Sequence, residues 1–458
     1  MLQYILNNLQ NSPKLYDEVL VDLKKFAQLL EDDISIGFLN SLPLKIKDCK
    51  SIEKLSETFN SAVENLSEQE EFFLKYTERF NSHKRKLNFI DFFCGAGGIS
   101  EGFCQAGYEP TFANDIDSNS LNSFYLNHFL QPSSVWHGDI LELVTKRKEI
   151  LESLEKVEIV VGGPPCQGFS TANRQRLIDD PRNKLYKGYL CALSIIKPKF
   201  FLIENVVGMA NKIDEIAEDI TSMLGSKYKF DYKILKAVDM GIPQARKRFI
   251  LIANRLGIDP SAIFSKIENR CDTCFSLKDA INDLPALGVK KEKNSPKIEN
   301  EIIGYKIRKK EKNITTKFGN AINLQTKSKF VLNHKNRFNN KRDVEIFTRL
   351  PQGCNSLHES ISEIMPYSNR NHIFKDKYYK LDASEPCKTI TSHMRLDCNM
   401  YIHPTQSRGL SPREAARIQT FPDHYFFLGS QNSWYHQIGN SVPVVMSRRI
   451  AEAIKDYL

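Results

Sequence analysis

A cysteine in a stiff loop is the first feature of this sequence that could do chemistry. The stretch VEIVVGGPPC begins with an apolar run of strand character at residues 157–161, and Gly162 and Gly163 end that strand. Two prolines then restrict the backbone, so Cys166 is held at the carboxyl end of a strand, where open α/β sheets bind their ligands. Two interpretations are open here: a small buried hydrophobic residue, as most free cysteines are, or a positioned nucleophile.

Charged side chains belong to two other predicted strands. Glu204 ends the apolar run FFLIEN, and a carboxylate in that position is costly to bury unless it is paired or functional. In QARKRF the spacing predicts that Gln244, Arg246 and Arg248 share one face of a strand, which would be strongly cationic. Cations of this kind can lower the pKa of a nearby thiol. For each residue alone, a structural ion pair remains an alternative.

The first strand leads into a glycine turn. Gly95, Gly97 and Gly98 open a helix, but the spacing GxGG lacks the third glycine of the dinucleotide-binding motif. Asp115 ends the next strand, where an acid can accept hydrogen bonds from ribose hydroxyls, and Asp139 ends the one after, within reach of an adenine amino group. This pattern describes a nucleoside site without phosphate recognition, so it favours S-adenosylmethionine over a nicotinamide cofactor.

The elements that position these residues follow a clear order along the chain. A chain of 458 residues is too long for one typical domain. Residues 1–86 have helical periodicity, whereas 87–275 alternate strands and helices, which predicts a mostly parallel, Rossmann-like α/β sheet with helices on both faces. Residues 276–409 predict a loop-rich lobe, and 410–458 predict two helices, the first capped by Ser411.

Composition restricts the class of protein and its partners. No apolar run is long enough to span a membrane, and ten scattered cysteines suit a reducing cytosol, so the sequence predicts a cytoplasmic protein without membrane contact. Cys271 and Cys274 form a lone CxxC, so no metal site is predicted. Residues 290–342 hold 16 Lys and Arg against 4 acids, a net charge of +12, which suits a phosphate backbone or, alternatively, a solvated loop.

A family resemblance rests on six motifs taken together. In chain order they are FCGAGG, PPCQGFS, ENV, QARKR, REAARIQTFPD and GNSVP. From about Leu87 to the C-terminus the chain resembles the DNA cytosine-5 methyltransferase family of the bacterial restriction-modification type. The resemblance implies a sheet of the S-adenosylmethionine-dependent methyltransferase kind, with the lobe at 276–409 as the target-recognition region. The first 86 residues match nothing in the family pattern.

The resemblance also implies a role for each matching residue. Cys166 would bond to carbon 6 of a flipped-out cytosine, Glu204 would act at N3, and Arg246 would hold the base O2 or a phosphate. The implied catalytic residues are Cys166, Glu204, Arg246, Arg248 and Asn440. The implied cofactor residues are Phe93, Gly95, Gly97, Gly98, Asp115, Ile116, Asp139, Ile140, Pro165, Leu185 and Asn440. The implied DNA-binding residues are Gln167, Ser170, Gln244, Thr389 and Ile390.

The implied partner is double-stranded DNA, bound by a monomer, with a cognate restriction endonuclease acting on the same site as a further candidate. Candidate base readers in the lobe are Arg337, Asn339, Arg370 and Asn371. Three alternatives remain: a silent DNA-binding protein, a transfer-RNA methylase and a nicotinamide oxidoreductase. The intact Cys166, Glu204 and arginines argue against the first, the long lysine-rich lobe against the second, and the missing glycine against the third.

Overall fold

The computed structural model describes residues 87–458 except for short gaps, which are 129, 131–133, 155–156, 166–182, 269–272, 294, 296–297, 311–314, 325–327, 329 and 367–376. Contacts divide the chain into two units, and the second, residues 88–128 and 136–458, holds the elements described below. The helical prediction for 1–86 lies outside the described residues. So do Cys166, Gln167, Ser170, Arg370 and Asn371.

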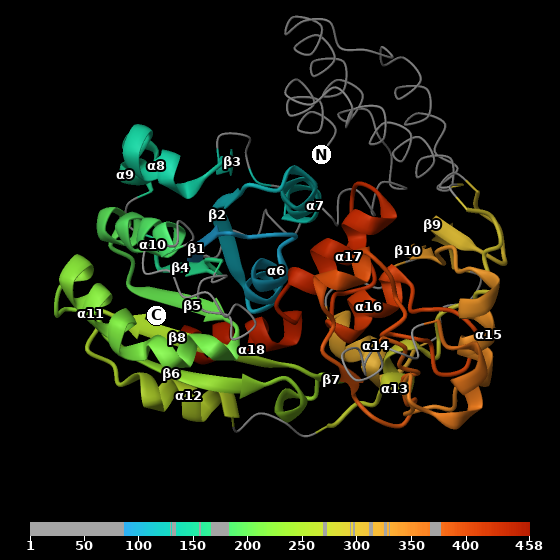
Figure 1. The fold of residues 1–458 in the computed structure, drawn as a ribbon. Helices are drawn as coiled ribbons and strands as arrows, with labels where there is room; N and C mark the ends of the chain where they lie inside the picture. The colour runs from blue at the N-terminus through green and yellow to red at the C-terminus, as the bar shows by residue number, and fades with distance from the viewer. Residues whose placement is uncertain are drawn as a thin grey trace, which may run out of the picture. The chain divides into compact units, whose positions relative to one another are not determined.

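A seven-stranded sheet with the order β3-β2-β1-β4-β5-β8-β6 forms the centre of this unit (Figure 1). Its strands are β1 (Leu87–Phe92), β2 (Tyr108–Asp115), β3 (Val135–His137), β4 (Ile159–Gly162), β5 (Phe200–Asn205), β6 (Lys229–Lys236) and β8 (Lys247–Asn254). Strand β4 pairs in parallel with both β1 and β5, whereas β8 runs antiparallel to β5 and to β6. The predicted α/β sheet is therefore confirmed, with one reversed strand near its edge.

Helices cover both faces of the sheet, because alternate residues of each strand face opposite ways. They are α6 (Gly98–Gln105), α7 (Ser118–His128), α8 (Ile140–Lys146), α9 (Lys148–Ser153), α10 (Asn183–Ile196), α11 (Ile213–Leu224), α12 (Pro260–Glu268) and α18 (Val444–Lys455). In β1, Phe89 packs on Phe103 of α6, with ring centroids 5.2 Å apart, while its neighbour Ile90 joins the core under α10. Helix α18, from the C-terminus of the chain, packs against α6 and α12.

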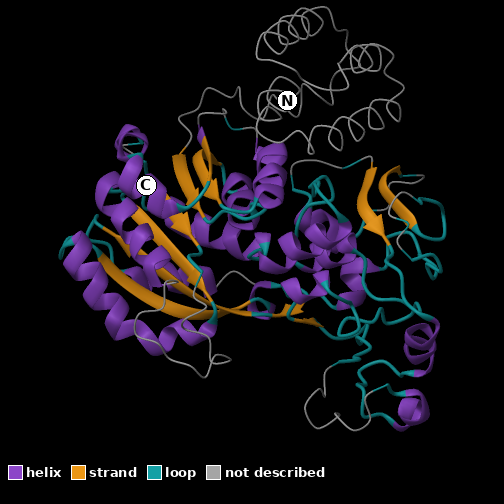
Figure 2. Ribbon diagram, turned by 45° about the horizontal axis from the view of Figure 1, so that its top comes forward, coloured by secondary structure: helices purple, strands orange, loops and turns teal. Residues whose placement is uncertain are grey.

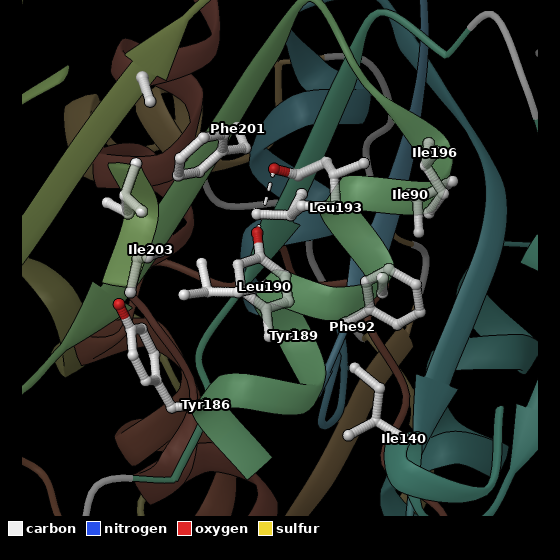
Figure 3. Close-up of a cluster of buried hydrophobic side chains, with 14 of the residues drawn as sticks. Ile90, Phe92, Ile140, Tyr186, Tyr189, Leu190, Leu193, Ile196, Phe201 and Ile203 are labelled. Carbon is white, nitrogen blue, oxygen red and sulfur yellow. Dashed lines mark hydrogen bonds between the residues drawn. The ribbon is translucent and has the colours of Figure 1, made fainter. Parts of the chain in front are cut away.

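The larger hydrophobic core lies between the sheet and helices α8 to α11. Figure 3 shows Tyr189 of α10 among the apolar side chains of this cluster. Its ring is fully buried, and its hydroxyl donates a hydrogen bond to the backbone oxygen of Leu202 at 2.8 Å. A buried tyrosine needs such a partner for its hydroxyl, and here the contact ties α10 to β5.

The region after α12 is built from short helices and strands joined by loops (Figure 2). They are α13 (Leu277–Ile281), β9 (Gly304–Lys309), α14 (Lys317–Ile322), β10 (Phe330–Lys335), α15 (Lys341–Arg349), η5 (Glu359–Ile364), β11 (Cys387–Lys388), η7 (Ser392–Arg395), α16 (Pro412–Ile418) and α17 (Gln431–Asn440). Strands β9 and β10 form an antiparallel ribbon, and β11 pairs with the two-residue strand β7 (Gln244–Ala245). A second hydrophobic core combines residues of α13, α14, α16 and α17, so it crosses the boundary predicted at 410.

Helix α16 begins with the capping box that the sequence predicts. The Ser411 hydroxyl accepts a hydrogen bond from the Glu414 N–H at 3.2 Å, and the Glu414 carboxylate accepts one from the Ser411 N–H at 2.7 Å. Glu414 also pairs with the buried Arg408, at 2.6 Å. Burial alone would raise the pKa of Glu414, but the guanidinium of Arg408 outweighs burial and lowers the pKa well below its usual value.

Candidate active site

The register of the sheet gathers the predicted site residues at one edge. Phe92 of β1, Gly162 of β4 and Ile203 of β5 lie side by side at the carboxyl ends of their strands. Because β8 is antiparallel, its first residues lie at this same edge, with Phe249 opposite Asn205. The glycine turn, the start of the Cys166 loop, Glu204 and Arg248 therefore all belong to one edge.

The three glycines of the turn serve different purposes. A Cβ atom on Gly97 would lie 2.5 Å from the Tyr425 hydroxyl, and one on Gly98 would lie 2.5 Å from the backbone oxygen of Val442. Both positions therefore require glycine for packing. A Cβ atom on Gly95 would meet no described atom within 4 Å, so this residue borders open space at the strand ends. Phe93, just before the turn, adopts a left-handed φ of 56°, which is uncommon for a bulky residue.

Asp115 connects the end of β2 to the glycine turn. Its carboxylate oxygens accept hydrogen bonds from the Gly95 N–H and the Asp117 N–H, each at 2.8 Å. Burial raises the pKa of Asp115, while these backbone donors oppose that effect. A carboxylate has about four acceptor positions, and the backbone N–H groups of Gly95, Asp117 and Ile116 occupy most of them, so about one remains for a ribose hydroxyl. The Ile116 side chain, which follows, is 71% exposed and offers an uncovered apolar surface beside this carboxylate.

The remaining predicted cofactor residues surround the same edge at different depths. Asp139 caps α8 by accepting a hydrogen bond from the Leu141 N–H at 2.9 Å. Phe93 and Leu185 are partly buried against the larger core, whereas Ile140 is fully buried within it (Figure 3). Ile140 therefore lies in the core under these strand ends and not on an exposed surface. The carboxylates of Asp115 and Asp139, the uncovered Gly95 and the exposed Ile116 suit the adenosine part of S-adenosylmethionine. The carboxylates can accept hydrogen bonds from it, and Ile116 offers an apolar surface for its base.

Replacing Asp115 with alanine is expected to weaken binding of S-adenosylmethionine by about 1.5–3 kcal/mol, because a charge-assisted acceptor is lost. Calorimetric titration with the cofactor measures this directly. Asp259→Ala is the matched control, since Asp259 also accepts a backbone N–H, from Ser261 at 3.0 Å, but follows β8 at the opposite edge. Equal cofactor affinity of the wild type and the Asp115 variant would place the cofactor elsewhere.

The loop that carries Cys166 is anchored by the end of β5. The Asn205 side-chain amide donates a hydrogen bond to the backbone oxygen of Pro164 at 2.9 Å. A Cβ atom on Gly163 would lie 3.1 Å from Glu204 Oε2, so glycine at this position lets the loop pass close to that carboxylate. Sequence reasoning assigned no role to Asn205, although its place directly after Glu204 in the same strand end is the signal that could have identified it.

Glu204 and Arg248 form an ion pair across β5 and β8. Arg248 Nε lies 2.7 Å from Glu204 Oε1, and the two side chains are only 15% and 13% exposed. The guanidinium therefore holds one carboxylate oxygen, while the other lies on the side of Gly163. This pairing fixes the orientation of Glu204 at the foot of the Cys166 loop.

Gln244 and Arg246, predicted to share a cationic face with Arg248, both lie buried at a junction with the lobe. Arg246 is buried and donates hydrogen bonds to the backbone oxygens of Ile390 at 2.7 Å and Ser441 at 3.0 Å. Burial, together with the neighbouring Arg248, lowers the pKa of Arg246 to about 9. Gln244 is equally buried and accepts a hydrogen bond from the Ile390 N–H at 2.9 Å. The two side chains join the sheet to the lobe.

This junction also changes the interpretation of the other predicted DNA-binding residues that the structure describes. The Ile390 side chain is fully buried, and the Thr389 hydroxyl donates to the backbone oxygen of Ala245 at 2.8 Å. Buried side chains cannot contact DNA in this conformation, which argues against the predicted direct contact of Gln244 and Ile390. Asn440 is exposed at the end of α17, where its amide lies 3.1 Å from His436 Nε2. Pro165, the last described residue before Cys166, is exposed too.

No group of three or more His, Cys, Asp or Glu side chains that could hold a metal ion is present among the described residues, and Cys271 lies outside that part of the chain. No helix in the described part is both long and apolar enough to cross a membrane.

The sheet order, its reversed strand and a glycine turn bonded to an acid at the next strand end define an S-adenosylmethionine-dependent methyltransferase fold. The sequence profile of the C-5 cytosine-specific DNA methylase family matches residues 87–456. The chain therefore belongs to this family and is a DNA (cytosine-5)-methyltransferase that uses S-adenosylmethionine, as the resemblance implied. This assignment excludes the nicotinamide oxidoreductase.

Individual proteins agree with the family assignment. The type II methyltransferase M.AgeI of Thalassovita gelatinovora is 32% identical over 433 residues, which cover 80% of this chain and 98% of that protein. M.DdeI of Desulfomicrobium norvegicum is 31% identical and covers 81% of this chain and 89% of that protein. A crystal structure described as a prophage-encoded DNA modification methyltransferase of E. coli matches with a TM-score of 0.62 at 26% identity, covering 81% of this chain and 99% of its own.

Proposed function

We propose that this methyltransferase acts on a flipped-out cytosine within a specific sequence of duplex DNA, through a covalent bond between Cys166 and carbon 6 of the base. The observation that carries the proposal is the Glu204–Arg248 pair, 2.7 Å apart, at the foot of the loop that leads to Cys166. This pair holds the Glu204 carboxylate in one orientation near the start of the loop whose sequence, PPCQGFS, contains Cys166.

The chemistry explains why a cysteine and an acid are needed together. Carbon 5 of cytosine is a weak nucleophile, but sulfur bonded to carbon 6 gives the ring enamine character and activates carbon 5. Bound S-adenosylmethionine would supply the electrophilic methyl group, which bonds to carbon 5 as S-adenosylhomocysteine leaves. The proton on carbon 5 is then removed, the sulfur–carbon 6 bond breaks, and Cys166 is regenerated. Every bond that the cysteine forms is broken again, so the enzyme turns over.

Glu204 relieves the charge that develops on the ring. Attack at carbon 6 places negative charge on the pyrimidine, and a proton or hydrogen bond supplied at N3 stabilises it. Arg248 holds Oε1, so Oε2 is the carboxylate oxygen left to act toward the base. Asn205 holds the loop through the Pro164 carbonyl, which limits the positions that the following residues can take. Cys166 cannot reach carbon 6 inside a stacked duplex, so the base must leave the helix.

The similar proteins suggest a biological setting. M.AgeI and M.DdeI are named type II methyltransferases. By analogy, this protein methylates one short duplex sequence as a monomer and protects it from a cognate restriction endonuclease. The lobe at 276–409 would select that sequence.

Incubation of the purified protein with methyl-labelled S-adenosylmethionine and either duplex DNA or transfer RNA tests the proposal. The label is expected in duplex DNA alone, and bisulfite sequencing of that DNA is expected to reveal one methylated sequence. Label in transfer RNA instead would support the RNA alternative. Absence of label from both nucleic acids would support the silent DNA-binding protein.

A further inference from the structure

We infer that the turn at residues 392–397 is a wedge that enters the DNA duplex beside the target base, with Leu396 as its apolar tip. The inference rests on the proposed function, because it takes duplex DNA with an extruded base as the partner. The turn begins with η7 (Ser392–Arg395) and follows the Thr389–Ile390 pair. Hereafter residues 392–397 are called the wedge turn.

The tip of the wedge turn is apolar and uncovered. Leu396 is 67% exposed, although an aliphatic side chain of this size is normally placed against other apolar groups. Its neighbours His393 and Arg395 are exposed as well, whereas Met394 points inward and is fully buried in the second hydrophobic core. The turn therefore has a buried base, and its outer surface carries one leucine preceded by two basic side chains.

Arg337 holds this exposed tip in a fixed shape. Its guanidinium donates hydrogen bonds to the backbone oxygens of Met394 at 2.7 Å and Leu396 at 3.1 Å, and to the Asn432 side chain at 3.3 Å. It also lies over the Tyr435 ring, 5.6 Å from the ring centroid. Both terminal nitrogens of Arg337 donate inside the protein, which argues against its predicted role as a base reader. A turn held in this way needs little ordering when it binds.

The wedge turn lies beside the candidate active site. A Cβ atom on Gly439 of α17 would come within 2.3 Å of the Ser392 nitrogen, so glycine there allows the turn to pack directly on the helix. Helix α17 ends one residue later, at Asn440. At the other end, Arg246 bonds to both the Ile390 and Ser441 backbones, which fixes the start of the turn to the junction next to Arg248.

Charge and shape favour duplex DNA as the occupant. His393 and Arg395 both precede the tip, and the one acid of the turn, Asp397, follows it and accepts a hydrogen bond from the Asn399 N–H at 3.1 Å. Basic side chains suit the phosphates that border a groove. Extrusion of a base leaves a gap in the stack, and apolar side chains such as leucine commonly enter between base steps. Leu396 is an exposed apolar side chain of this kind, on the turn that packs against α17 beside the candidate active site.

The test compares Leu396→Ala with Leu256→Ala on two duplexes. Leu256 is 43% exposed and follows β8 at the opposite edge of the sheet, so it controls for the loss of an exposed leucine. One duplex carries the methylation site found by bisulfite sequencing, and the other carries the same site with the target cytosine mispaired. Methyl transfer is measured in single turnover, and thermal unfolding of each variant verifies the fold.

Leu396→Ala is expected to slow methyl transfer to the matched duplex by about tenfold or more. On the mispaired duplex its rate should be close to that of the wild type, because extrusion of a mispaired base needs less energy. Leu256→Ala should match the wild type on both, and Leu396→Met should restore most activity. An unchanged rate for Leu396→Ala, or an equal loss on both duplexes, would overturn the wedge while leaving the proposed function intact. Wild-type protein that methylates neither duplex would overturn both.

Discussion

Replacement of Cys166 by serine is expected to reduce methyl transfer by on the order of a thousandfold or more, because an alcohol is a far weaker nucleophile than a thiolate. Binding to the target duplex should change little, since the loop residues around the sulfur remain. Single-turnover assays with labelled S-adenosylmethionine measure the first effect, and titration of fluorescent duplex measures the second. A variant that retains more than about a tenth of the wild-type rate would exclude Cys166 as the nucleophile.

A duplex with 5-fluorocytosine at the target position provides an independent test of the covalent bond. Fluorine at carbon 5 cannot leave as a proton does, so the sulfur–carbon 6 bond persists after methyl transfer. The wild type should form a complex that survives denaturing electrophoresis, and Cys166→Ser should not. Cys354→Ser is a suitable control, since Cys354 is a partly exposed free cysteine in the lobe. An adduct that disappears with Cys354 rather than with Cys166 would reassign the nucleophile.

The strand-end residues could be predicted because they depend on short-range patterns. Apolar runs that end in Gly162, Glu204 and Asp115 identify strands, and parallel pairing then brings their carboxyl ends to one edge. The capping box at Ser411 and Glu414 was equally local and is confirmed. What could not be predicted was the partner of each polar group, such as the Gly95 N–H for Asp115, because such partners are distant in sequence.

Gln244 and Arg246 show where alternation misleads. A period of two places them on one face, but it does not say whether that face meets solvent or another part of the chain. Here β7 pairs with β11, and the backbone of Ile390 from the lobe lies against both side chains. Two backbone oxygens then compensate the buried guanidinium, so an arginine that the resemblance assigns to the base or a phosphate makes an internal junction in this structure.

Net charge misleads in the lobe for a related reason. The basic excess of 290–342 includes the run Arg308, Lys309 and Lys310, yet Arg308 pairs with Glu301 at 2.5 Å and Lys310 with Asp423 at 3.3 Å. Of the three, only Lys309 is exposed. Composition counts charges but does not pair them, so a neutralising triple variant would also disturb internal ion pairs.

Arg417 is expected to be among the most important side chains for stability. It is buried in α16, donates to both carboxylate oxygens of Asp423 at 2.7 and 2.8 Å, and lies 2.5 Å from Asp283 Oδ1. Asp283 belongs to the segment after α13, so the arginine connects that segment to α16. Burial would raise the pKa of Asp423, but Arg417 outweighs burial and lowers it far below the usual value.

Arg417→Met should therefore lower the free energy of unfolding by about 3–5 kcal/mol, because it leaves buried carboxylates without their main partner. Lys310 lies 3.3 Å from Asp423 and is still present in the variant, so the loss in free energy of unfolding should be nearer to about 3 kcal/mol. Urea denaturation measures the change. Arg349→Met is the matched control: its pair with Glu345 is exposed, with side chains 45% and 46% accessible, so the expected loss is at most about 0.5 kcal/mol.

The dependence of this loss on pH provides a further check. In the wild type, the lowered pKa of Asp423 means that its contribution to stability is present above the ordinary carboxyl pKa and declines as the pH falls. In Arg417→Met, a buried Asp423 is more stable protonated, so acid should help the variant while it harms the wild type. The difference between the two proteins should therefore be largest near neutral pH and shrink toward pH of about 4. A constant difference, or one no larger than that of Arg349→Met, would show that Arg417 stabilises the protein by packing alone.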